Sequence, residues 1–208
     1  MKGENTQMIK NLVFDMGNVL IRYSPQMFLD RFVKDTSYHT LLLREVFMGL
    51  EWQQTDLGSL SLDDAVARCC TRLPSCLHET VRTLFYNWSD PLLQIEGMEA
   101  LLKRAKEKGY ALYLLSNTSP AYRTFSKGIA GIEYMDGEFI SCEWKMMKPD
   151  VRIYHLFCNH FGLVPAQSVF IDDSSANVLG AINAGMQGIV FHDRKQLEKA
   201  LSAMGIDL

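Results

Sequence analysis

Residues 11–20, NLVFDMGNVL, constrain the fold more than any other stretch of the chain. A short run of apolar, β-branched and aromatic residues ends at Asp15, which indicates a strand covered on both faces, as in a parallel sheet. A charged side chain at the end of such a strand lies at the sheet edge where open α/β sheets bind ligands. Gly17 and Asn18 suit a sharp turn that lets a ligand approach the backbone. We expect Asp15 to serve as a nucleophile or metal ligand, and a turn-capping aspartate is the alternative.

Helical and strand patterns alternate from Gly97 onwards. The later strand-like runs lie at residues 110–115, 139–140, 168–171 and 188–191. This alternation predicts an α/β fold with a doubly wound parallel sheet. Residues 23–91 show only helical periodicity and are too long for a simple crossover. We therefore predict an α/β core domain of residues 1–22 and 92–208, with an inserted α-helical cap domain of residues 23–91.

The composition favours a small-molecule ligand. The 208 residues carry a formal net charge of −3, with 22% charged residues, so nothing favours nucleic acid or a membrane surface as a partner. No apolar run approaches the ~20 residues of a membrane span, and the first residues lack the apolar block of a signal peptide. The five cysteines form no CxxC pair and are typical of free thiols. We expect a cytoplasmic protein that is a monomer or weak homodimer.

Polar residues gather at the ends of the predicted strands and in nearby loops. They are Asp15, Ser116 with Asn117, Lys148, and Asp172 with Asp173. Each alone has a structural explanation, such as a helix cap or a solvated lysine, but adjacent carboxylates repel unless a cation lies between them. Asp15, the Gly17 carbonyl and the acidic pair offer the oxygen ligands that Mg²⁺ prefers. Ser116 with backbone N–H groups suits a phosphoryl oxygen, and Lys148 adds the positive charge that a phosphate needs.

Four motifs in order resemble those of the haloacid dehalogenase (HAD) superfamily of phosphohydrolases. VFDMGNVL is similar to its first motif, LLSNTS to its second, Lys148 within SCEWKMMKPD to its third, and VFIDDSSAN to its fourth. The resemblance runs from residue 9 to the last strand, and the helical insertion is similar to a C1-type cap. Within the superfamily the chain looks most like the subgroup with Asp-Leu-Gly-Asn-Val, which includes bacterial α-D-glucose-1-phosphate phosphatases.

This resemblance implies a Mg²⁺-dependent phosphatase acting on a small phosphorylated metabolite such as a sugar phosphate. It assigns Asp15 as the nucleophile that forms an aspartyl-phosphate, which water then hydrolyses. Asp15, the Gly17 carbonyl and Asp173 would hold Mg²⁺. Asp172 would assist through water, and Lys148 would restrain the nucleophile. The residues that would bind the transferring phosphoryl group are Ser116, Asn117 and Lys148.

One departure from the family pattern concerns acid–base catalysis. Most phosphatases of the family carry a second Asp two positions after the nucleophile, and this chain has Gly17 there. Such a group contributes roughly 10²- to 10⁴-fold, so its absence predicts a slow enzyme, a substitute group, or a substrate with a good leaving group. A 2-haloacid dehalogenase is one alternative, but it does without metal, and Asp172 with Asp173 argue against it. A non-catalytic phospho-ligand binder is the other.

A polar and aromatic stretch in the predicted cap begins at Trp52. Gln53, Gln54 and Thr55 follow it, a combination that suits a hydroxyl-rich ligand. We expect Trp52 and the two glutamines to face the active site and contact the leaving group. The alternative is that Trp52 fills the core of the cap, where large aromatic residues usually pack.

Overall fold

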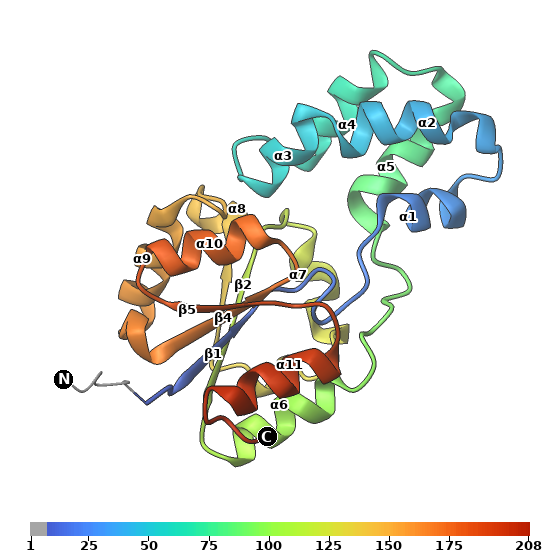
Figure 1. Ribbon diagram of the computed structural model, residues 1–208. Coiled ribbons are helices and arrows are strands. Elements are labelled where there is room, and N and C mark those ends of the chain that lie inside the picture. Colours follow the sequence, from blue (N-terminus) through green and yellow to red (C-terminus); the bar gives the residue numbers. More distant parts are fainter. Residues whose placement is uncertain (1–7) are drawn as a thin grey trace.

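The computed structural model describes residues 8–208 (Figure 1). Residues 1–7, which the sequence analysis assigns to the core domain, lie outside the described residues. One five-stranded parallel sheet has the order β3-β2-β1-β4-β5. Its strands are β1 (Asn11–Phe14), β2 (Ala111–Ser116), β3 (Gly137–Ile140), β4 (Ser168–Asp172) and β5 (Gln187–Val190). The chain runs outward from central β1 in both directions, which is the doubly wound sheet that the sequence predicts.

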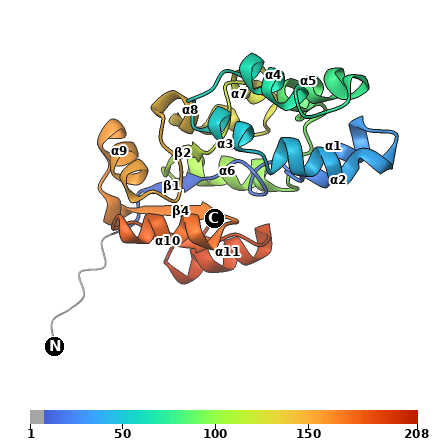
Figure 2. The same ribbon diagram turned by 90° about the horizontal axis from the view of Figure 1, so that it is seen from above.

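Helices cover both faces of the sheet (Figures 1 and 2). The covering helices are α6 (Met98–Glu107), α9 (Val151–Phe161), α10 (Ser175–Asn183) and α11 (Arg194–Ala203). Successive β1 side chains point to opposite faces. Leu12 therefore packs in one cluster with Leu101 of α6, and Val13 packs in the other with Ile153 of α9. Burial on both faces explains why β1 is an uninterrupted apolar run.

A group of helices between β1 and α6 lies apart from the sheet, at the upper right of Figure 1. We call these helices the cap: α1 (Pro25–Phe32), α2 (His39–Leu42), α3 (Leu50–Asp56), α4 (Leu62–Cys70) and α5 (His78–Asn87), with a π-helical turn, Leu43–Phe47, after α2. They fall within residues 23–91, the range predicted for the inserted domain. Helix α3 contains the polar and aromatic stretch that begins at Trp52. It has only seven residues, too few to display a helical period.

Short helical pieces complete the described chain. They are α7 (Tyr122–Phe125), α8 (Ser141–Trp144) and the 3-10 turns Thr36–Tyr38, Ser75–Leu77, Ser126–Gly128, Ile132–Tyr134 and Pro165–Gln167. Ser61 caps the start of helix α4, because its hydroxyl accepts the Asp64 N–H at 3.1 Å. Gly162, in the left-handed conformation, ends α9. Across residues 8–208, none of the helices combines the length and the apolar character needed to cross a membrane.

The cap has an aromatic core of its own. The Trp52 ring lies 4.7 Å from that of Phe47 and 5.2 Å from that of Phe85, measured between centroids. Phe28 of α1 contacts both Phe47 and Trp88, which extends the cluster toward the linker that returns to the core. Such contacts hold short helices together that would be unstable alone.

Candidate active site

The sheet register brings the two acidic motifs together. Phe14 is in register with Ile171 of β4, and the Asp15 N–H donates to the Ile171 carbonyl at 2.9 Å. Asp15 and Asp172 therefore leave neighbouring strands at the same edge of the sheet. Ser116, the last residue of β2, ends the strand on the other side of β1 and is buried. The predicted convergence of strand ends is present in the fold.

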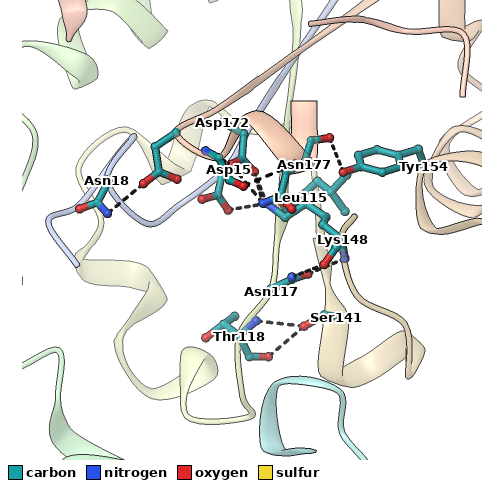
Figure 3. A network of polar contacts seen from close by, with 12 residues as sticks. Asp15, Asn18, Leu115, Asn117, Thr118, Ser141, Lys148, Tyr154, Asp172 and Asn177 are labelled. Carbon is teal, nitrogen blue, oxygen red and sulfur yellow. Dashed lines mark hydrogen bonds and ion pairs between the residues drawn. The ribbon is translucent and has the colours of Figure 1, made fainter. Parts of the chain in front are cut away.

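Lys148 joins these strand ends through a buried ammonium group (Figure 3). Its Nζ donates to Asp15 Oδ1 at 2.7 Å, to Asp172 Oδ2 at 2.7 Å and to the Leu115 carbonyl at 2.9 Å. Burial lowers the pKa of Lys148, but the two carboxylates outweigh it and the net shift is upward. Lys148 is therefore a fixed positive charge that holds one oxygen of Asp15 in place.

The Asp15 carboxylate is costly to ionise without further positive charge. Burial raises its pKa to about 6, and the nearby Asp172 adds to the rise, while Lys148 counteracts part of it. Two carboxylates share the single ammonium group, so the pair keeps a net negative charge. An additional cation would favour the ionised form of Asp15.

Three carboxylates could hold such a cation. Asp15, Asp172 and Asp173 each offer an oxygen, and these oxygens lie within 4.8 Å of one another. Asp172 is fully buried and accepts hydrogen bonds from the Ser174 N–H and the Asn177 amide as well as from the ammonium group. Asp173 is exposed and accepts one hydrogen bond within the described chain, from the Asn18 amide at 3.0 Å. Asp173 therefore has the more available oxygens, and hard oxygen ligands of this kind suit Mg²⁺.

The turn after Asp15 differs in one detail from the sequence expectation. Asn18 has the left-handed conformation, with φ 54°, whereas Gly17 does not. The Asn18 side chain stabilises the turn by accepting the Tyr23 N–H at 3.0 Å. The backbone at Gly17 would therefore accept a residue with a side chain.

Asn117 positions the lysine. Its amide donates to the Lys148 carbonyl and its oxygen accepts the Lys148 N–H, both at 2.9 Å. The side chain expected to bind a phosphoryl oxygen is therefore committed to the backbone of the neighbouring loop. Thr118, the next residue, is held by a hydrogen bond from its N–H to the Ser141 hydroxyl at 2.9 Å (Figure 3). The two hydrogen bonds between the Asn117 side chain and the Lys148 backbone explain how the loop keeps the Lys148 side chain directed at Asp15.

A cavity of about 260 Å³ opens over these groups. Core residues in its lining include Asp15, Gly17, Ser116, Asn117, Lys148 and Asp173. The residues contributed by the cap and the segments that flank it are Tyr23, Trp52, Asp56 and Trp88. Asp172 is outside the lining because it is fully buried beneath the cavity floor. A small molecule in this cavity would contact both the core and the cap.

The glutamines expected at the site require a correction. Residues four apart share one helical face, so α3 directs Trp52 and Asp56 toward the cavity together. Gln53 and Gln54 are rotated away from that face, and neither lines the cavity. Trp52 combines the two roles that were posed as alternatives, because it lines the cavity and packs in the aromatic core of the cap.

Asp56 is a site residue that sequence reasoning missed. Its side chain meets the cavity and is otherwise surrounded by protein, and this burial raises the pKa of its carboxyl group to about 7. The sequence held one signal, its spacing of four from Trp52, which is informative only once α3 is known to be a helix. The burial depends on tertiary contacts that no local pattern records.

Known proteins resemble this chain in sequence and in fold. The family of haloacid dehalogenase-like hydrolases matches residues 9–185. The sesquiterpene phosphatase astK of Aspergillus oryzae is 26% identical over 185 residues, covering 88% of this chain and 90% of that protein. The D-ribitol-5-phosphate phosphatase of Bacteroides thetaiotaomicron is 27% identical over 189 residues, covering 82% and 86%. A HAD family enzyme of the same bacterium, solved as a magnesium complex, shares the fold with a TM-score of 0.73 and 24% identity, over 93% of this chain and 98% of that one. The chain belongs to the haloacid dehalogenase-like hydrolases.

Proposed function

We propose that this hydrolase is a Mg²⁺-dependent phosphatase that cleaves a small phosphorylated metabolite, of the sugar phosphate class, through an aspartyl-phosphate on Asp15. One observation carries the proposal: Lys148 is shared by Asp15 and Asp172, while Asp173 stands beside them with available oxygens. This arrangement supplies a nucleophile, a fixed positive charge and a cation site around one cavity. Relatives named as phosphatases support the same activity.

Each side chain has a role that follows from its contacts. Lys148 fixes Oδ1 of Asp15, so the carboxylate is oriented before a ligand binds. An oxygen of Asp15 attacks phosphorus, the bond from phosphorus to the ester oxygen breaks, and the leaving oxygen takes a proton. Water then attacks the phosphorus of the aspartyl-phosphate, which releases inorganic phosphate and regenerates Asp15. Ser116 and backbone N–H groups of the loop after β2 bind the phosphoryl oxygens, since the Asn117 side chain is occupied.

Asp15, the Gly17 carbonyl and Asp173 would hold Mg²⁺, and Asp172 would support the site from below. When bound, Mg²⁺ screens the repulsion between an anionic nucleophile and an anionic phosphate. The carboxylate cluster fits this role because its negative charge exceeds the charge of the one buried ammonium group. The same excess argues against a metal-free dehalogenase, in which a second free carboxylate would oppose the nucleophile.

The lining of the cavity supports a polar metabolite of modest size. Trp52, Trp88 and Tyr23 supply aromatic walls, and hydroxyl and amide groups lie at the base. A volume of about 260 Å³ suits a small phosphorylated compound better than a polymer. One relative is named for D-ribitol 5-phosphate, a polyol phosphate that is chemically similar to the sugar phosphates that we propose.

Phosphate release from a panel of sugar, polyol and aliphatic phosphates tests the proposal, with Mg²⁺ and with EDTA. We expect turnover that depends on Mg²⁺ and is fastest on a sugar or polyol phosphate. Metal-independent release of halide from 2-chloropropionate would replace the proposal with a dehalogenase. Binding of phosphate esters without turnover would identify a phospho-ligand binder.

A further inference from the structure

We propose that Asp56, from helix α3 of the cap, is the general acid and base of this reaction and replaces the carboxylate that is missing at position 17. The inference rests on the proposed phosphatase activity. It assigns a catalytic residue that the four motifs do not contain.

The first step concerns the space beside Gly17. A β-carbon added there would lie 3.5 Å from Tyr23 Cβ and 3.9 Å from Asp15 Oδ2, which are ordinary contact distances. The Gly17 φ angle is outside the left-handed region. Neither backbone strain nor crowding therefore requires glycine at this position. The side chain of Tyr23 borders the space that an acid at position 17 would use.

The second step leads from Tyr23 to Asp56. The Tyr23 side chain is partly buried next to Trp52 and Asp56, and this burial together with the Asp56 charge raises the pKa of its phenol. All three side chains line the same cavity as Asp15. Asp56 therefore faces, from the cap, the same part of the cavity that a side chain at position 17 would face from the core.

The third step is that the Asp56 carboxyl has no structural partner. No side-chain hydrogen bond or ion pair to it is found within residues 8–208. By contrast, Glu45 and Glu51 of the cap both bind Arg72, at 2.9 Å and 2.8 Å. A carboxyl group that is partly buried, faces a ligand cavity and stabilises nothing nearby is available for proton transfer.

The surroundings of Asp56 suit an acid and base near neutral pH. The titratable groups that face it are the Tyr23 phenol and the Cys142 thiol, and burial raises the pKa of both. Both groups stay uncharged near neutral pH, and Glu143 on the same helix α8 is paired with Arg123. Burial therefore dominates and raises the pKa of Asp56 to about 7, the value at which a group both gives and takes a proton efficiently.

Contacts with the core fix Asp56 over the site. The Ser141 hydroxyl donates to the Asp56 carbonyl at 2.5 Å. Two residues later, Gly58 has a φ of 73° and lies so close to α8 that an added β-carbon would be 2.0 Å from the Cys142 carbonyl oxygen. The end of α3 is therefore anchored on the core, which limits the movement of Asp56 relative to Asp15.

The proton that Asp56 donates is replaced by one from water within one catalytic cycle. Protonated Asp56 donates its proton to the ester oxygen as the oxygen of Asp15 bonds to phosphorus and the ester bond breaks. The Asp56 carboxylate then accepts a proton from the water whose oxygen attacks the aspartyl-phosphate. Phosphate leaves, Asp15 is free, and Asp56 is protonated as at the start.

The dependence of kcat/KM on the leaving group tests this assignment. Removing an acid should slow esters that leave as unstable alkoxides and spare p-nitrophenyl phosphate, which leaves as a stabilised anion. We expect Asp56→Asn and Asp56→Ala to lose roughly 10²- to 10⁴-fold on alkyl and sugar phosphates and less than about tenfold on p-nitrophenyl phosphate. The matched control is Asp63→Asn, an exposed cap aspartate paired with Arg82, which should behave as wild type on every ester.

Two results would overturn the assignment. An equal loss on all esters in both variants would show that Asp56 only supports the structure. Unchanged kcat/KM on alkyl phosphates would show that another group transfers the proton. Either result leaves the phosphatase proposal intact as long as the wild type is active with Mg²⁺. An inactive wild type would instead refute the proposed function itself.

Discussion

Replacing Asp56 by asparagine should stabilise the fold at alkaline pH. The folded protein binds the Asp56 proton with a pKa of about 7, whereas the unfolded chain binds it with the ordinary value of 3.8. Between these values the folded state holds the proton and the unfolded state does not. The contribution of Asp56 to the free energy of unfolding therefore falls as pH rises from about 4 to about 7, while an asparagine cannot titrate.

The size of the effect follows from the same two pKa values. A shift from 3.8 to about 7 corresponds to at most about 4 kcal/mol in the free energy of unfolding. Part of the side chain meets the cavity, where water weakens the penalty, so we expect roughly 2 kcal/mol. For a chain of this length, such a change raises the Tm by about 4–8 °C.

Urea unfolding in EDTA across this pH range measures the difference between the variant and the wild type. The two free energies should be similar near pH 4 and diverge by about 2 kcal/mol above pH 7, with Asp56→Asn the more stable. Asp63→Asn, which removes an exposed carboxylate paired with Arg82, is the control for the loss of a surface negative charge and should change the free energy of unfolding by less than about 1 kcal/mol. A difference curve for Asp56→Asn that does not change with pH would refute the burial argument.

Asp15→Asn should keep the fold but leave less than about a hundredth of the wild-type rate, because the amide has the shape without the charge. Phosphate release alongside circular dichroism tests this, and a faster variant would contradict the aspartyl-phosphate route. Asp173→Ala should raise the Mg²⁺ concentration needed for activity, whereas Asp172→Ala should also lower the free energy of unfolding by roughly 3–5 kcal/mol, because it removes the buried acceptor of the Lys148 ammonium, the Ser174 N–H and the Asn177 amide. Metal titration and urea unfolding separate the two, and identical profiles would contradict the division of roles. Gln53→Ala and Gln54→Ala should leave KM and kcat unchanged, since neither side chain lines the cavity, and a raised KM would return them to the site.

The core of the site was predictable because its signals are local. An apolar strand that stops at a carboxylate is readable in sequence, and strand ends of a parallel sheet must meet at one edge. Asp15, Ser116 and Asp172 could therefore be placed near one another before any contact was known. Lys148 was grouped with them as a loop residue, its role in restraining Asp15 followed from the resemblance to a family, and the structure supplies its contacts with both acids.

Apart from Trp52, the residues that the cap contributes to the site were not predictable, because their placement depends on contacts that are not local in the sequence. Helix α3 is too short to show a period, so the rotation that turns Gln53 away and Asp56 inward is invisible in the sequence. The raised pKa of Asp56 comes from burial that includes Tyr23, a neighbour only in the folded chain. Asn117 was assigned to the ligand because the sequence shows its place in a loop but not its hydrogen bonds.

The close contact between Gly58 and the Cys142 carbonyl limits how descendants of this chain can diverge. Any side chain at position 58 would have to displace backbone atoms of α8. A single substitution of Gly58 therefore cannot widen the separation of cap and core without straining the backbone. Trp52 and Trp88 border the cavity as well as the aromatic core of the cap, so a change of ring size there reshapes the cavity at some cost in packing. We therefore expect related proteins with other substrates to differ in the size of the aromatic residues that line the cavity, while the distance between the cap and the core is conserved.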